Sequence, residues 1–386
     1  MMKHLKFLIG FILLVLTALA SFGTFSLPRV EKGDSDRFSA ERASKHIEVM
    51  SKVPHSVEHP VERAQVRRYL YDILEDMGGE PEIHEYDSIK FRYGGYFDIG
   101  NVYCQFDPLS GPADSYIMMV AHFDSRFRQT KLQKTVYSYG AGDDAYGVGS
   151  ILELLSQALK YRDEWHQGVR ILFTDSEENA LDGMKCAAKY NPELFENVGY
   201  VVNLESRGMN GPVLLFETSA NNENVLDLYS EAKAPYGYSL TTVVYRFLPN
   251  NTDFTIVKDS IPGINFSTID NINYYHVDDD NFENINLATI QHYGAQIEPI
   301  LEEFLTSGEY RDPDALKGDE DLVFFTVPIL GIFSFTKPQF TLFCSVVFAL
   351  FCLALVLNIS ARNATLKGVI KKILSKNIIC LKTICY

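Results

Sequence analysis

Seven ionisable side chains that could hold a metal ion or move a proton lie in short polar stretches of the sequence. They are His122, Asp124, Asp143, Asp144, Glu177, Glu178 and Glu205. A second histidine, His276, follows in the polar stretch 274–280. Carboxylates that converge on one place repel one another, and a divalent cation relieves that repulsion. Imidazole and carboxylate suit zinc, and two ions about 3.5–4 Å apart can share one carboxylate and still leave room for a water.

Each polar stretch also has an ordinary structural explanation. A histidine two residues before an aspartate is common, and adjacent glutamates usually form a solvated face. Asp143 and Asp144 could cap the helix that follows them, and His276 could be a structural histidine in a tyrosine-rich loop. Each explanation accounts for one stretch alone, whereas a metal site accounts for all of them in this order.

The elements that must position these residues are apolar strands. A continuous apolar run begins at Tyr116 and ends at the first polar stretch, and the runs 169–173 and 198–204 end at the next two. A glycine-containing turn at 140–144 leads into a helical pattern at 148–159. Continuous apolar strands that alternate with helices predict an α/β fold with a mostly parallel central sheet and helices on both faces. Ligands bind beyond the carboxyl ends of such strands, where these polar residues lie.

The region before Tyr116 predicts further elements of the same domain. Residues 38–51 and 60–77 have the apolar spacing of helices, and Gly78-Gly79 ends the second one. Short extended segments follow at 81–86 and 98–106.

Two apolar runs predict membrane segments. Residues 7–22 are uncharged and follow Lys3 and Lys6, so they form a signal anchor or a cleaved signal peptide, of which we favour the anchor. Residues 340–357 can span a bilayer, and the basic residues after them favour the cytoplasm. Both membrane ends then point inward and the region between them lies outside the cytoplasm. The shorter run 322–335 contains Pro328 and Gly331 and reads as a strand pair or an interfacial segment.

The resulting domain prediction has five parts. They are a signal anchor and transmembrane helix at 1–27, the α/β domain with the candidate metal residues at 28–310, a juxtamembrane segment at 311–338, a transmembrane helix at 339–358 and a cytoplasmic basic tail at 359–386.

Composition narrows the class of partner. The net charge is −15, and an acidic chain without a basic patch between residues 100 and 310 is a poor binder of nucleic acid. Two of the six cysteines, Cys104 and Cys186, lie in the predicted soluble domain, and no CxxC occurs, so neither a disulfide scaffold nor a zinc ribbon is indicated. Membrane lipid is one expected partner, and the sequence does not indicate an oligomeric state.

Five motifs together resemble the co-catalytic zinc aminopeptidase family. They are AHFDSR, GAGDDAYGVG, FTDSEENALDG, VVNLESRG and YYHVDDDNFENIN, and the similarity runs from about Phe38 to Leu305. The family includes bacterial leucine aminopeptidases and glutamate carboxypeptidase-like enzymes. VVNLESRG together with GPVLLFETS looks most like its endoplasmic-reticulum and vacuolar membrane metalloprotease branch.

The resemblance implies a role for each candidate residue. His122 would bind one zinc ion, His276 the other, and Asp143 would bridge both. Glu178 would complete the site of one ion and Glu205 that of the other, with Glu177 as the general base. Asp124 would hold the imidazole of His122. The peptide bond between Asp143 and Asp144 is typically cis in this family, and Tyr274 or Tyr275 would donate to the oxyanion.

Two positions depart from the family pattern without removing a ligand. Glu205 stands where many relatives have Asp, and Val277 follows His276 where many have Thr or Ser. The prediction is therefore an active two-zinc exopeptidase that acts on a peptide substrate, with residues 28–310 as its zinc peptidase domain. An aminopeptidase is favoured over a carboxypeptidase. The alternatives are a glutaminyl cyclase-like acyltransferase with a single zinc and a non-catalytic membrane ectodomain.

Overall fold

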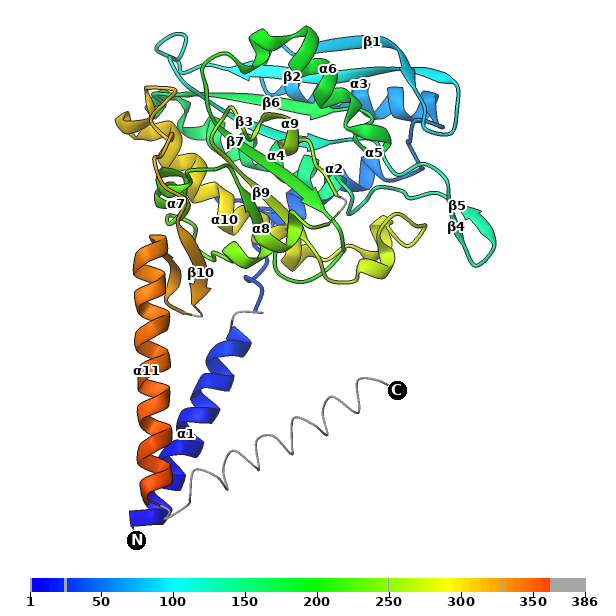
Figure 1. Cartoon of the computed structure of the whole chain (residues 1–386). Coiled ribbons are helices and arrows are strands. Elements are labelled where there is room, and N and C mark those ends of the chain that lie inside the picture. The colour runs from blue at the N-terminus through cyan, green and yellow to red at the C-terminus, as the bar shows by residue number, and fades with distance from the viewer. Residues whose placement is uncertain (1, 24–25, 249, 328, 362–386) are drawn as a thin grey trace. The chain divides into compact units, whose positions relative to one another are not determined.

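The computed structural model describes residues 2–23, 26–248, 250–327 and 329–361. The chain divides into two compact units, Met1–Ser334 and Phe335–Tyr386. The first unit contains every candidate site residue and is built around one sheet (Figure 1).

Seven strands form the central sheet. In spatial order they are β1 (Glu82–Lys90), β2 (Tyr96–Phe106), β6 (Gly168–Thr174), β3 (Tyr116–His122), β7 (Val198–Ser206), β9 (Gly263–Thr268) and β8 (Leu214–Thr218). The four central strands β6, β3, β7 and β9 pair in parallel. The outer strands pair antiparallel, β1 with β2 and β2 with β6 on one side and β8 with β9 on the other. The predicted α/β fold with a mostly parallel central sheet is confirmed. All residues of β3, β6 and β7 are buried, which explains why these strands read as continuous apolar runs.

Helices cover both faces of this sheet. The α-helices of the first unit that follow α1 are α2 (Ala40–Met50), α3 (Pro60–Asp76), α4 (Ala145–Ala158), α5 (Glu177–Ala180), α6 (Asp182–Tyr190), α7 (Glu223–Tyr229), α8 (Ser239–Tyr245), α9 (Phe254–Val257) and α10 (Leu287–Thr306). Short 3₁₀ helices occur at Leu159–Glu164, Pro192–Phe195, Ile272–Tyr274, Phe282–Asn284 and Gly308–Tyr310.

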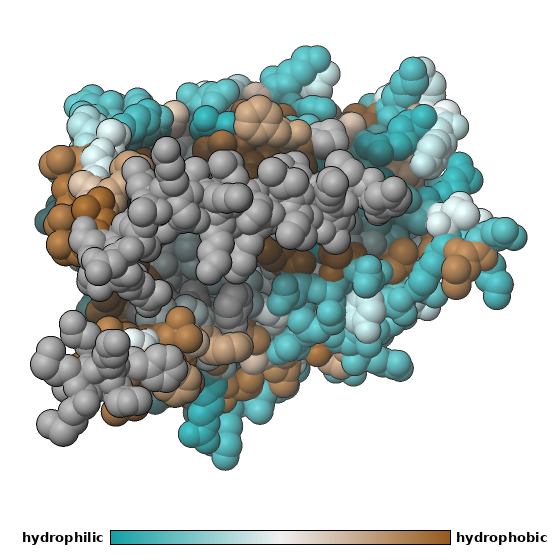
Figure 2. All heavy atoms as spheres, turned by 60° about the horizontal axis from the view of Figure 1, so that its bottom comes forward, coloured by the Kyte–Doolittle hydropathy of each residue, from teal (hydrophilic) through white to brown (hydrophobic). Residues whose placement is uncertain are grey.

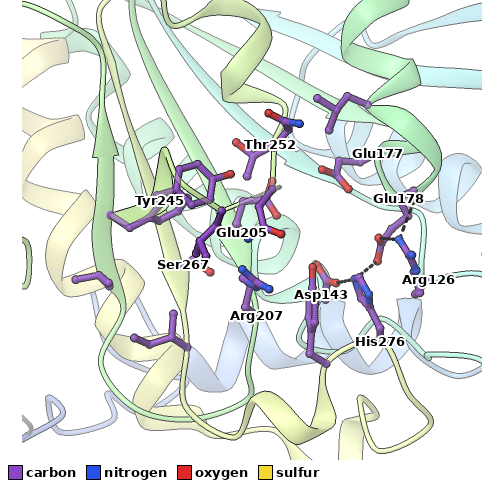
Figure 3. Close-up of a pocket in the computed structure, with 18 of the residues that line it drawn as sticks. Arg126, Asp143, Glu177, Glu178, Glu205, Arg207, Tyr245, Thr252, Ser267 and His276 are labelled. Atoms are coloured by element: carbon purple, nitrogen blue, oxygen red, sulfur yellow. Dashed lines mark hydrogen bonds and ion pairs between the residues drawn. The ribbon is translucent and has the colours of Figure 1, made fainter. Parts of the chain in front are cut away.

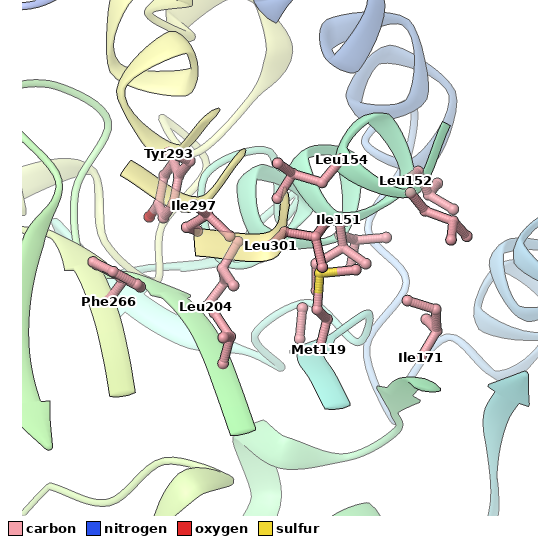
Figure 4. Close-up of a cluster of buried hydrophobic side chains, with 14 of the residues drawn as sticks. Met119, Ile151, Leu152, Leu154, Ile171, Leu204, Phe266, Tyr293, Ile297 and Leu301 are labelled. Atoms are coloured by element: carbon pink, nitrogen blue, oxygen red, sulfur yellow. The ribbon is translucent and has the colours of Figure 1, made fainter. Parts of the chain in front are cut away.

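The alternation of side chains along β3 separates the two cores. Ile117 and Met119 belong to the larger cluster, which packs against α4 and α10 (Figure 4). Met118 and Val120 point to the opposite face and join the smaller cluster with Met184 of α6. Since successive strand residues point to opposite faces, a strand buried on both sides is apolar along most of its length.

Two hairpins lie outside the central sheet. Strands β4 (Gln129–Lys131) and β5 (Lys134–Val136) form one, and β10 (Val323–Val327) and β11 (Gly331–Phe335) form the other. The second hairpin confirms the strand pair predicted for residues 322–335.

The two predicted membrane segments are both helical. Among the described residues, one helical segment, Lys337–Leu357 of α11 (Lys337–Ala361), is long and apolar enough to cross a membrane. The N-terminal helix α1 (Met2–Gly23) contains a shorter apolar segment, Leu8–Leu19, so its role as an anchor stays a prediction. Residues 362–386, which make up most of the predicted basic tail, lie outside the described residues.

Candidate metal centre

The structure brings the five predicted metal ligands together at the carboxyl edge of the parallel strands. His122 is the last residue of β3, and Glu205 lies near the end of β7. Glu178 lies in α5, which begins three residues after β6 ends. Asp143 precedes α4, and His276 lies in the loop after β9. The five ligand candidates are up to 154 positions apart in the chain, from 122 to 276. They meet because the strands that carry or precede them are neighbours in the sheet.

The five ligand candidates form two groups of three that share Asp143. His122, Asp143 and Glu205 form one group, and Asp143, Glu178 and His276 form the other. Asp143 Oδ1 lies 3.2 Å from His122 Nε2. Asp143 Oδ2 lies 3.2 Å from His276 Nε2 (Figure 3). Each oxygen of one carboxylate thus faces a different group, which is the arrangement of a bridging ligand.

The tautomer of His122 shows that its group is suited to a cation. His122 Nδ1 donates to the backbone carbonyl of Asp124 at 3.0 Å, so in the neutral ring Nε2 carries a lone pair. That lone pair faces Asp143 Oδ1 at 3.2 Å and Glu205 Oε2 at 3.8 Å. Three electron-rich atoms that face one another are stabilised by a positive ion between them, and imidazole nitrogen with carboxylate oxygen is a zinc donor set.

The second group shows the same property through its unsatisfied atoms. Asp143 Oδ2, Glu178 Oε1 and His276 Nε2 are buried and have no hydrogen-bond partner among the described residues. His276 Nε2 nevertheless lies 3.0 Å from Glu178 Oε1. Buried polar atoms are normally satisfied, so three unsatisfied atoms that converge indicate a place for an ion. The residues present fit two zinc ions.

Burial and mutual repulsion disturb the titration of the acidic residues. Burial raises the pKa of Glu205 well above its usual value, and the charges of Asp144 and Asp143 raise it further. Burial also raises the pKa of Glu177, followed by the charge of Glu205. Burial would lower the pKa of His276, but the carboxylates of Glu178 and Asp143 raise it to about 9. Protons therefore compete for the positions that a divalent cation would occupy.

Asp124 supports the centre differently from the expectation drawn from the family resemblance. Its backbone carbonyl, not its carboxylate, is the nearer partner of His122 Nδ1, since Asp124 Oδ1 lies 3.5 Å from that nitrogen. The carboxylate is fully buried and accepts the backbone N–H of Glu177 at 2.9 Å and that of Glu178 at 3.4 Å. Asp124 thus ties the start of α5, which carries both glutamates, to the end of β3.

Asp144 has the capping role that its residue type suggested. Its side chain accepts the backbone N–H of Gly147 at 3.1 Å and caps α4. The Asp143–Asp144 peptide bond is cis, as the resemblance implied.

Two supporting residues were not predicted from the sequence. Arg126 Nη1 donates to Glu178 Oε2 at 2.7 Å and to the Glu178 carbonyl at 2.9 Å. Asp280 accepts the backbone N–H of Gly142 at 2.5 Å and the hydroxyl of Ser138 at 2.7 Å, which holds the loop before Asp143. Both lie inside the recognised motifs, at the end of AHFDSR and in YYHVDDDNFENIN, and that position is the signal that could have identified them.

The metal donors open into a cavity of about 850 Å³. Glu177 and Tyr275 line it, and Tyr274 does not. The ring of Tyr275 stacks on that of His276 at 3.5 Å, and the Arg207 guanidinium lies 5.1 Å from the Tyr275 ring. Leu240, Val244 and Leu248, from α8 and the turn after it, form an apolar wall. The cavity therefore combines a charged floor with an apolar side.

A parallel-stranded α/β domain with two imidazole–carboxylate groups at its strand ends defines a protein of the metallopeptidase class. Residues 101–301 match peptidase family M28, and the chain belongs to that family.

Three similar proteins illustrate the range of its relatives. The chain is 31% identical over 260 residues to endoplasmic reticulum metallopeptidase 1 of Homo sapiens, and this aligned region covers 65% of this chain and 27% of that protein. It thus spans about a quarter of the length of that relative. Glutaminyl cyclase of Porphyromonas gingivalis has a TM-score of 0.56 at 18% identity, covering 70% of this chain and 99% of that one. An aminopeptidase of Aneurinibacillus sp. strain AM-1 has a TM-score of 0.56 at 14% identity, and the match covers 72% of this chain and 97% of that one. At these identities the two structures show a shared fold.

Proposed function

We propose that this M28 metallopeptidase is an aminopeptidase that binds two zinc ions per chain and removes residues from the N-terminus of peptides. The observation that carries the proposal is the position of Asp143, whose two oxygens face two separate groups of donors. His122 and Glu205 would hold one ion, and Glu178 and His276 the other.

Bound zinc supplies the Lewis acidity that activates a water and polarises the scissile carbonyl. Glu177 accepts the proton from the attacking water and delivers it to the leaving amine. Its carboxyl lines the cavity beside Glu178 and Glu205. Tyr275, which lines the cavity against His276, is placed to donate to the oxygen that becomes negative.

The buried carboxylates of the cavity support an aminopeptidase over a carboxypeptidase. Of the arginines that line the cavity, Arg126 is already paired with Glu178, and Arg207 lies over the ring of Tyr275. The buried carboxylates around Glu177 favour a substrate amine, because opposite charges attract strongly where water is excluded.

Zinc analysis of the purified full chain, together with a substrate panel, tests the proposal. We expect two zinc ions per chain, hydrolysis of aminoacyl anilides, and loss of that hydrolysis with a chelator. One zinc ion with cyclisation of N-terminal Gln peptides would instead establish a glutaminyl cyclase. Bound zinc without turnover of either substrate class would establish a non-catalytic ectodomain.

The Glu177→Gln variant tests the assignment of the general base. The substitution keeps the size of the side chain and removes its ability to accept the proton. We expect unchanged zinc content and a loss of kcat of about 10²–10⁴-fold. Turnover at the wild-type rate would refute this role.

We further propose that α11 attaches the chain to a membrane, with the catalytic domain on the extracytoplasmic side. The apolar segment Lys337–Leu357 and the basic residues of the sequence after it support this orientation. Protease protection in sealed microsomes tests it. Digestion of the catalytic domain by protease added outside the vesicles would show that the domain has the opposite orientation.

A further inference from the structure

The β10–β11 hairpin exposes apolar residues where a soluble domain would carry polar ones. Ile329 is 90% exposed and Leu330 is 69% exposed, and both lie between the two strands at the hairpin tip. No charged residue occurs in the sequence from Leu322 to Thr336. Exposed hairpin tips in water are normally built from polar turn residues, so this composition calls for an apolar environment.

The exposed apolar surface extends to the neighbouring helix. Tyr238 pairs with Phe325 of β10 through a backbone bridge, and the backbone N–H of Phe324 donates to the Ser239 hydroxyl at 2.6 Å. The segment that follows exposes Leu240 and Phe247, the latter by 85%. Hydrophobic residues appear among hydrophilic ones on the molecular face turned toward the viewer in Figure 2.

Chain connectivity identifies the environment as a membrane. One residue separates the end of β11 at Phe335 from the start of α11 at Lys337. The ring of Phe335 stacks on that of Phe343 at 5.8 Å and lies 6.3 Å from that of Phe340. The chain at Phe335 therefore lies alongside the first two turns of α11.

The depth of Phe343 follows from helix geometry. The 21 residues of Lys337–Leu357 rise about 31 Å at 1.5 Å per residue, which matches a hydrocarbon core of about 30 Å. Phe343 then lies about 9 Å along the helix from Lys337. With Lys337 at the edge of the hydrocarbon core, Phe343 and the side chain that stacks on it lie in the outer part of that core, next to the headgroup layer.

We propose that the β10–β11 hairpin lies in the interfacial layer of the membrane, with Ile329 and Leu330 in contact with lipid acyl chains. The inference rests on the proposed membrane attachment through α11. It adds a second contact with the bilayer, contributed by the catalytic unit itself. Helix α8, whose residues line the cavity, packs against β10 of this hairpin.

Tryptophan quenching by brominated lipids tests this proposal on the full chain in vesicles. The sequence contains one tryptophan, Trp165, which is buried in the core and gives the same background in every variant. Leu330→Trp places a probe at the hairpin tip. Leu132→Trp is the matched control, because Leu132 is 90% exposed at the tip of the β4–β5 hairpin, where Lys131 and Lys134 flank it. Phe348→Trp places a third probe on an exposed position within α11.

We expect acyl-chain bromines to quench the emission added at positions 330 and 348 and to leave the emission added at position 132 unchanged. Quenching at 348 without quenching at 330 would overturn the hairpin proposal and leave the membrane span intact. Absence of quenching at 348 would overturn the span and the hairpin together. If a second copy of the chain covered the hairpin instead, the probe at 330 would resist a water-soluble quencher and ignore the brominated lipid, which would also overturn the proposal.

Discussion

Replacement of Asp124 by Asn tests whether the carboxylate that ties α5 to β3 controls the metal centre. The carboxylate of Asp124 is fully buried and receives two backbone N–H groups, from Glu177 at 2.9 Å and from Glu178 at 3.4 Å. Asn keeps the shape but carries one oxygen and one NH₂ group, so one backbone N–H must then face another donor. The substitution also removes the negative charge.

The size of the effect follows from these two contacts. A hydrogen bond to a charged group contributes about 1.5–3 kcal/mol, and the 3.4 Å contact contributes at the weak end. We therefore expect a total loss of about 2–4 kcal/mol, shared between folding and metal binding. Loss of a residue that orients a ligand typically lowers metal affinity about 10–100-fold, and a tenfold change corresponds to about 1.4 kcal/mol. The two estimates agree.

The assay is a competition titration of zinc against a chromophoric chelator, with kcat/KM for an aminoacyl anilide measured in parallel. Asp175→Asn is the control, because this buried carboxylate pairs with Arg63 of α3 at 3.0 Å and accepts the backbone N–H of Gly100 of β2 at 2.9 Å, and so is bound to these two elements. We expect the control to lose stability and keep its zinc affinity. Wild-type zinc affinity in Asp124→Asn, or an equal loss in both variants, would refute the reasoning.

Two other perturbations have defined outcomes. Arg126→Gln removes the 2.7 Å contact with Glu178, and we expect zinc affinity to fall about 10–100-fold. Arg128→Gln, whose partner is Glu58, should not change it, and equal affinities in the two variants would exclude the role of Arg126. Burial lowers the pKa of His292 from 6.5 to about 4. Because the unfolded chain then binds a proton that the folded chain does not, stability is lost as the pH falls from about 6.5 toward 4, by up to about 3 kcal/mol. Urea unfolding with a chelator present should show a flatter pH profile for His292→Gln than for the wild type, and parallel profiles would contradict the assignment.

The central elements could be predicted because their hydrophobic patterns are unambiguous. Each residue of β3, β6 and β7 is buried, so the strands appear in the sequence as mostly apolar runs, with Arg170 and Asn203 as polar residues inside β6 and β7. The polar residues that follow the runs could then be assigned to one edge of the sheet without knowledge of the strand order. His122, Glu178 and Glu205 follow from that edge, whereas the roles of Asp143 and His276 as ligand candidates came from the family resemblance.

Contacts between side chains on separate loops could not be predicted in this way. The pairing of Arg126 with Glu178 depends on how two loops fold over the sheet edge, and no periodicity encodes it. The separate contacts of the Asp124 carbonyl and carboxylate could not be predicted either, because only the conformation of the loop decides which of the two lies nearer to His122. The contribution of α8 to the cavity wall also depends on tertiary packing, since Thr242 is the one buried residue of this short helix.

The strand order explains why the metal donors gather around His122 in particular. From β3 the chain passes through α4 to β6 on one side, and from β6 it passes through α6 to β7 on the other side of β3. The first connection packs on one face of the sheet and the second on the opposite face. The connections therefore diverge above the end of β3 and leave a crevice there, as in other open α/β sheets. His122 ends β3 inside that crevice, and Glu178 and Glu205 reach it from the two flanking strands. Asp143, at the start of α4, lies between them and is the residue that both donor groups can share.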